Sequence, residues 1–145
     1  MTHRTIRMII EGQVPVTAPA DITVAKAARL MQQNQVGALM IVDRAGKLAG
    51  VFTERDALFR VLAAGLDGTH TPIADVMTAR PLTIGPDQHF AHALSMMHDG
   101  GFRHVPVVEG GKPVGMVSAR DALGPELEAF VYELLRQEQV SQILA

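Results

Sequence analysis

An internal repeat constrains the fold of this chain more than any other sequence feature. A pattern of seven residues at positions 50–56 recurs 65 positions later, at 115–121. In each copy a glycine opens an apolar run, the run ends at a hydroxyl residue, and a carboxylate follows three positions on: Thr53 and Asp56 in the first copy, Ser118 and Asp121 in the second. A fixed period of this kind is the signature of a repeated structural unit.

The repeat extends well beyond these seven residues. Two further blocks align at an offset of 66, residues 24–28 with 90–94 and residues 36–43 with 102–109. The offset changes by one between the turns 44–46 and 110–111, where a change of length costs little. We therefore expect two units and an appended segment: a first unit at 5–65, a second unit at 73–124, and a C-terminal helix at 125–145.

Each unit is expected to run strand, helix, strand, strand, helix. Apolar residues with helical spacing predict the first helix of each unit: Val24, Ala27, Ala28 and Met31, then Phe90, Ala93, Leu94 and Met97. Asn34 is expected to end the first of these helices. The other expected elements are extended segments at 5–10, 14–17, 38–42, 48–53, 104–108 and 113–118, and helices at 54–64 and 119–123. This alternation predicts an α/β (α+β) domain with pseudo-twofold symmetry.

Two helices carry specific packing expectations. In the helix at 54–64, we expect Leu58, Val61 and Leu62 to point inward and Gly65 to follow the last turn. The C-terminal helix, opened by Pro125, has no counterpart in the first unit. Its apolar residues are expected to pack on the core of the chain, with pairing to a partner chain as the alternative: Leu127, Phe130, Val131 and Leu134.

The composition argues against several classes of function. The 145 residues carry a formal net charge of −2 and no cluster of lysine or arginine, so the chain lacks the electrostatic footprint of a nucleic-acid-binding protein. Without cysteine there is no disulfide, thiol nucleophile or thiolate metal site. No apolar run is long enough to cross a membrane, and residues 1–10 lack the apolar core of a signal peptide. We expect a soluble cytoplasmic protein.

The repeated hydroxyl and carboxylate have two physical interpretations. A Ser or Thr before a helix with an acid three residues later forms a capping box, which stabilises a helix by about 1 kcal/mol. The same junction offers free N–H groups that favour an anion nearby. Its carboxylate can accept both hydroxyls of a ribose, while the strand before it offers backbone N–H and C=O groups to a base. One pair of residues can fill both roles.

In their order and spacing these motifs resemble a tandem pair of CBS (cystathionine β-synthase) domains, also called a Bateman module. The resemblance covers nearly the whole chain and includes residues 75–78 (Asp-Val-Met-Thr) and 102–108 (Phe-Arg-His-Val-Pro-Val-Val). It implies a regulatory module that binds an adenosyl ligand between its units, AMP, ADP, ATP or S-adenosylmethionine. It also implies a homodimer that acts on an unidentified regulated protein.

The resemblance implies the residues of a first and better site. Ser118 and Asp121 would hold the ribose. Arg103 and His104 would reach the phosphates, with Arg120 as a helper. The residues around the base would be Met116, Val36, Gly37 and the loop that contains Ile10, Gly12 and Val14.

The resemblance also implies a second site, with Thr53, Asp56, Phe102 and the segment from Thr78 to Thr83. By alignment its phosphate-facing positions are Gly37 and Ala38, which carry no charge. Arg103 or Arg55 would have to take their place. We therefore expect one stronger nucleotide site rather than two equal ones.

Other interpretations stay open. The motifs could survive only as helix caps in a dimeric interaction scaffold with vestigial clefts. His89, His92 and His98 suggest a metal site, but without cysteine or a well-spaced carboxylate we interpret them as solvated side chains. No motif of a catalytic nucleophile frames Ser118, so we expect no enzyme and no required cofactor.

Overall fold

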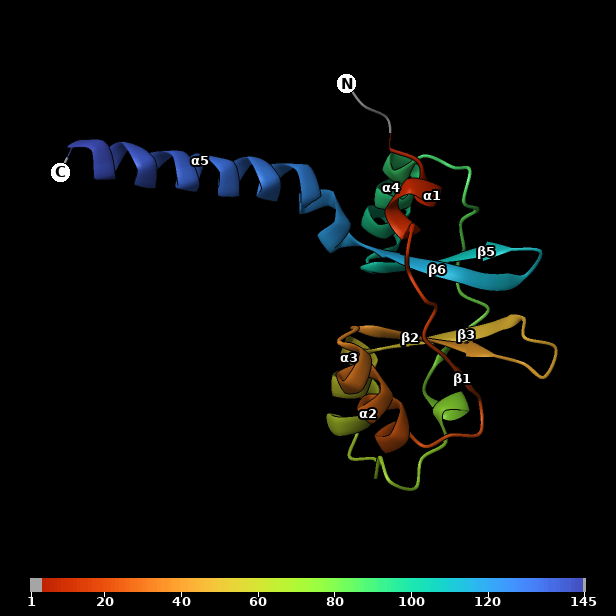
Figure 1. Cartoon of the computed structure of the whole chain (residues 1–145). Helices are drawn as coiled ribbons and strands as arrows, with labels where there is room; N and C mark the ends of the chain where they lie inside the picture. The colour runs from red at the N-terminus through yellow and green to blue at the C-terminus, as the bar shows by residue number, and fades with distance from the viewer. Residues whose placement is uncertain (1–3, 145) are drawn as a thin grey trace.

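The computed structural model describes residues 4–144, apart from the side chains of residues 125–128 and 131. It is a mixed α/β fold of two similar units, from which one long helix extends (Figure 1). The helices are α1 (Ile6–Ile10), α2 (Val24–Asn34), α3 (Glu54–Asp56), α4 (Phe90–Gly100) and α5 (Gly124–Leu144). The strands are β1 (Thr17–Pro19), β2 (Ala38–Val42), β3 (Leu48–Thr53), β4 (Thr78–Ala79), β5 (His104–Glu109) and β6 (Lys112–Ser118). Among residues 4–144, no helix combines the length and apolarity that a bilayer crossing requires.

The first unit is built on a four-stranded sheet in the order β1-β2-β3-β4. β1 pairs with β2 in parallel, and the other two pairs are antiparallel. Leu39, Ile41 and Phe52 from the two central strands are fully buried and belong to one apolar core. These runs are continuously apolar because both faces of the strands are covered.

Helix α2 covers this core and has the boundaries that its sequence predicts. The side chain of Thr23 accepts a hydrogen bond from the Lys26 N–H over 3.2 Å, which caps the first turn. The helix ends at Asn34, and Gln35 adopts a left-handed conformation. Val24, Ala27 and Met31 are buried, whereas Ala28 is exposed and the expectation that it points inward is wrong.

The second unit repeats this plan with a β5–β6 hairpin and helix α4. The two strands pair antiparallel from His104 opposite Ser118 to Glu109 opposite Lys112. Gly110 and Gly111 form the turn with positive φ angles, which glycine adopts without strain. On α4 the buried residues are Phe90, Ala93 and Met97, as the helical spacing predicts.

The segment that leads into each unit packs into the core of the other unit. Ile6 of α1 is buried with the second core, and its N–H donates to the Gln88 carbonyl over 2.8 Å. In the same way Ile73 is buried in the first core, and its N–H donates to the Ile22 carbonyl over 2.8 Å. Figure 1 shows α1 beside α4. Residues 6–10 lie within the expected first unit at 5–65, yet they contact the second unit.

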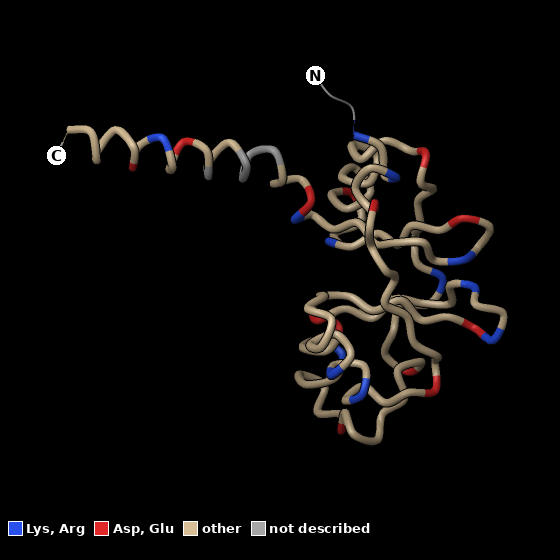
Figure 2. Tube along the Cα trace, viewed as in Figure 1, with Lys and Arg blue, Asp and Glu red and all other residues tan. Residues whose placement is uncertain are grey.

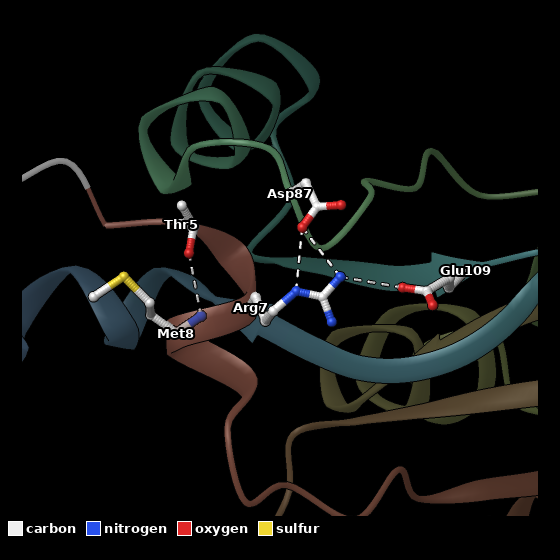
Figure 3. A network of polar contacts seen from close by, with 5 residues as sticks. All are labelled: Thr5, Arg7, Met8, Asp87 and Glu109. Atoms are coloured by element: carbon white, nitrogen blue, oxygen red, sulfur yellow. Dashed lines mark hydrogen bonds and ion pairs between the residues drawn. The ribbon is translucent and has the colours of Figure 1, made fainter.

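Arg7 ties α1 to the second unit from outside (Figure 3). Its Nε and Nη2 atoms both donate to Asp87 Oδ1 over 3.1 Å, and Nη2 also donates to Glu109 over 3.4 Å. Asp87 precedes α4 and Glu109 ends β5, so one guanidinium joins α1 to two segments of the second unit.

The expectation of an extended segment at residues 5–10 is wrong, because residues 6–10 form helix α1. Thr5 accepts a hydrogen bond from the Met8 N–H and caps the helix. Ile6 is buried in the second core, and Ile9 and Ile10 pack partly buried against it. These positions have the i, i+3, i+4 spacing of a helix face. The contact with the second unit overrides the local preference of an Ile-rich run for a strand.

The helix at 54–64 is also packed differently from the prediction. After α3 the chain continues as a π-helix over Ala57–Leu62, with the Ala63 N–H donating to the Leu58 carbonyl over 2.8 Å. The wider turn changes the angular spacing of the side chains. Val61 is buried, but Leu58 is 49% exposed and Leu62 is 72% exposed, so the inward placement of these two leucines is wrong. Gly65 has a positive φ, as expected after the last turn.

Helix α5 extends away from both units (Figure 1), so the expectation that it packs on the core of the chain is wrong. Phe130 is 59% exposed and Leu134 is 45% exposed. Tyr132, Leu135 and Val140 are exposed too, so the apolar residues are spread around the helix rather than gathered on one face. The side chains of Leu127 and Val131, named in the same expectation, lie outside the described residues.

Candidate functional site

Each repeated carboxylate caps a helix and opens onto a cavity. The Asp56 N–H donates to Thr53 Oγ1 over 3.1 Å, and the Thr53 N–H donates to Asp56 Oδ2 over 3.0 Å. At the second junction the Ser118 N–H donates to Asp121 Oδ2 over 2.8 Å. The capping interpretation is therefore correct, and it leaves one oxygen of each carboxylate for another partner.

The remaining oxygens have different surroundings. Asp56 Oδ1 lies 3.4 Å from Nε of Arg60, so this carboxylate is already paired on both sides. Within the part of the chain that the structure describes, Asp121 Oδ1 makes no hydrogen bond or ion pair. Asp121 therefore has more capacity to accept hydroxyl groups than Asp56.

The first cavity lies between the two units and has a volume of about 800 Å³, a size typical of small-molecule sites. It is lined by most of the residues expected at the first site: Ser118, Asp121, Arg103, His104, Met116, Val36, Gly37, Val14 and Arg120. Ile10 and Gly12 are not among the lining residues. Ile10 instead lies against Gly115, where an added Cβ would come within 2.8 Å of it.

The second cavity has a volume of about 820 Å³ and contains the other junction. Its lining includes Thr53, Asp56, Arg55, Thr78 and Phe102, as expected for the second site. Thr83 is not among the lining residues.

The second cavity carries more positive charge than the sequence predicts. Arg55, Arg60, Arg80 and Arg103 all line it. Gly37 and Ala38, which the alignment placed at its phosphate-facing positions, line the first cavity instead. The absence of charge at those two positions therefore gives no reason to expect a weak second site. Only Arg55 and Arg103 were expected here, because Arg60 and Arg80 belong to no shared motif.

Arg103, His104 and Glu54 lie where the two cavities meet, since all three line both. An added Cβ at Gly37 would be 3.0 Å from Glu54 Oε1 and 3.3 Å from His104 Nε2, so glycine leaves room for both side chains. Burial lowers the pKa of His104, and Arg103 lowers it further, against the opposing effects of Glu54 and Asp121. Near neutral pH this imidazole can therefore act as a neutral donor or acceptor.

The free energy of unfolding is expected to fall as the pH is lowered from 7 to about 5. Because the folded protein holds the pKa of His104 below its ordinary value of 6.5, the unfolded chain binds more protons at this site than the folded chain as the pH falls through 6.5. Urea unfolding at a series of pH values measures the slope. His104→Gln should flatten it, while His92→Gln, an exposed control on α4, should keep it. Equal slopes for His104→Gln and wild type would contradict this assignment.

The arrangement of the described side chains gives little support to a metal site or to a basic surface for nucleic acid. Among the residues that the structure describes, no group of three His, Asp or Glu side chains is placed to hold a metal ion. His92 and His98 are exposed on α4, and His98 Nδ1 lies 3.4 Å from Asp99. Figure 2 shows basic and acidic residues distributed over both units rather than collected on one face.

The fold and the paired cavities define a tandem CBS module, and the comparison with known proteins agrees. Residues 12–63 and 73–125 each match the CBS domain, and the chain belongs to this family. A CBS domain-containing protein of Arabidopsis thaliana, CBSCBSPB2, is 37% identical over 121 residues, which cover 83% of this chain. The match spans only 22% of that relative's length.

Two solved structures of similar size contain ligands. A CBS domain protein from Pyrobaculum aerophilum complexed with AMP is 27% identical, has a TM-score of 0.75, and is matched over 81% of this chain and 89% of that chain. A CBS domain pair in complex with 5′-methylthioadenosine and S-adenosyl-L-methionine is 28% identical, with a TM-score of 0.75 over 83% of this chain and 94% of that chain.

Proposed function

We propose that this chain is a regulatory module that binds AMP, ADP or ATP in the cavities between its units and passes the occupancy on to a partner protein. The observation that carries the proposal is the Asp121 carboxylate, which caps a helix with one oxygen and lines a cavity of about 800 Å³ between the units. Arg103 and His104 line the same cavity and can face a phosphate. The AMP complex of a related module supports the same ligand class.

A regulatory effect requires that the ligand binds two arrangements of the module with different affinity. Each cavity is lined by residues of both units, so a ligand that contacts both units favours arrangements in which the units are held together. A homodimer of modules, implied by the family, belongs to the same proposal, and no catalytic step is part of it.

A thermal unfolding series tests the proposal. A ligand present at 100 times its Kd should add about 2.7 kcal/mol to the free energy of unfolding. AMP, ADP and ATP at millimolar concentration are expected to raise the Tm of wild type, but not that of the Asp56→Asn/Asp121→Asn double variant. If none of them shifts the Tm, the interaction scaffold with vestigial clefts is the better account.

S-adenosylmethionine is the second candidate ligand and needs its own arm of the same series. Glu54 lines both cavities and offers a carboxylate to a sulfonium, whereas the arginines favour phosphates. The complex of another related module with this compound supports including it. A Tm shift with S-adenosylmethionine alone would replace the nucleotide proposal by a sulfonium sensor.

A further inference from the structure

The side chain of Gln13 is hydrogen-bonded to the outer edge of strand β6, at the wall of the first cavity. The Met116 N–H donates to Gln13 Oε1 over 3.0 Å, and Gln13 Nε2 donates to the Met116 carbonyl over 3.1 Å. Met116 lies on β6 two residues before Ser118, and both Met116 and Gln13 line the cavity. One carboxamide therefore satisfies both backbone groups of the residue that leads into the ribose-binding motif.

The other unit closes the corresponding edge in a different way. Val51 on β3 is the repeat counterpart of Met116, and it pairs in register with Thr78 of β4. The backbone of β4 thus pairs with the edge of β3 at Val51, while the side chain of Gln13 pairs with the edge of β6 at Met116. Gly115 permits the close approach, because a Cβ there would lie 2.8 Å from Ile10 Cβ and 3.2 Å from Gln13 Oε1.

The chemistry of this contact matches that of a base. A carboxamide presents one acceptor beside one donor. Adenine presents the same pair on the edge that carries its exocyclic amine, a ring nitrogen beside an N–H. We infer that Gln13 competes with adenine for the Met116 backbone and so sets the affinity and base selectivity of the first cavity. This inference rests on the proposed binding of adenosyl nucleotides.

Displacing Gln13 requires little rearrangement of the fold. Residues 11–14 are all exposed, and Gly12, with a positive φ, has open space around it. Moving this loop therefore buries or uncovers little apolar surface. The two hydrogen bonds lost by Gln13 are replaced by two from adenine, so the side chain reduces the net gain from binding the base.

Calorimetry with AMP and IMP tests the inference in an Asp56→Asn background, which weakens the second cavity. Adding Gln13→Ala should tighten AMP binding about tenfold, since no intramolecular bonds have to be given up. IMP should not gain, because its N1–H and O6 present donor and acceptor in the reverse order once the ribose is anchored at Asp121. Gln137→Ala, at an exposed glutamine of α5 that lines neither cavity, is the matched control and should change neither ligand.

Hydrogen exchange at the Met116 amide provides a second measurement that needs no ligand. The amide should exchange faster in Gln13→Ala than in wild type and become slow again when AMP is added. Unchanged exchange, or AMP binding that is equal or weaker in Gln13→Ala, would overturn the role of Gln13 while leaving the proposed function intact. If AMP binds none of the proteins, including wild type, the proposed function fails and this inference fails with it.

Discussion

The Asp121→Asn protein is expected to bind AMP about 10 to 100 times more weakly than wild type. A carboxylate accepts charge-assisted hydrogen bonds from the ribose hydroxyls, each worth about 1.5–3 kcal/mol. In wild type the Ser118 N–H donates to Asp121 Oδ2 over 2.8 Å. An asparagine has a single side-chain oxygen, and this hydrogen bond occupies it. The cap is kept and the ribose loses its acceptor, so affinity falls while the fold is retained.

Calorimetry with AMP and with its 2′,3′-dideoxy analogue measures this effect. The analogue lacks both hydroxyls and should bind wild type and Asp121→Asn alike. Asp99→Asn, an exposed substitution at the end of α4, is the charge-matched control. Asp56→Asn is expected to lose less affinity, because Asp56 already lies 3.4 Å from Arg60. Equal losses at the two positions would contradict the difference between the carboxylates.

Arg103→Ala should weaken ATP binding by about tenfold or more at both cavities and leave adenosine binding unchanged. Arg103 lines both cavities, and its guanidinium can pair with phosphate in either. The residue is exposed, so truncation removes little packing. Isothermal titration with ATP and adenosine separates the phosphate contribution from that of the nucleoside.

Arg44→Ala, on the exposed turn between β2 and β3, is the control for the loss of one positive charge. It should leave both ligands unaffected at moderate ionic strength, because a distant surface charge is screened. A loss of adenosine affinity in Arg103→Ala equal to the loss of ATP affinity would show that Arg103 supports the cavity wall rather than the phosphates.

Much of the fold could be predicted because its signals are local. The buried strands, helices α2 and α4, and the glycine turn between β5 and β6 follow from apolar spacing and turn residues within about a dozen positions. Asp56 and Asp121 could be singled out because the repeat marks the same junction twice. Their unequal second oxygens, in contrast, depend on Arg60, which no motif identifies.

The features that could not be predicted depend on contacts between distant segments. The helical form of residues 6–10 follows from their packing on the second unit, and no pattern within the segment indicates that partner. Arg80 reaches the second cavity, and Gln13 reaches Met116, only after the leading segments have crossed between the units. The π-helix after α3 shifts Leu58 and Leu62 from a face that ideal helical spacing assigns to the core.

The exchange of leading segments has a consequence for synthesis on the ribosome. Domains usually fold as units in the order in which they emerge. Here the first core lacks Ile73 and Val76 until after its own repeat has been translated, and the second core uses Ile6, which precedes the first repeat. Neither core is completed by its own repeat, so the nascent chain must keep Ile6 available until the second repeat has been made.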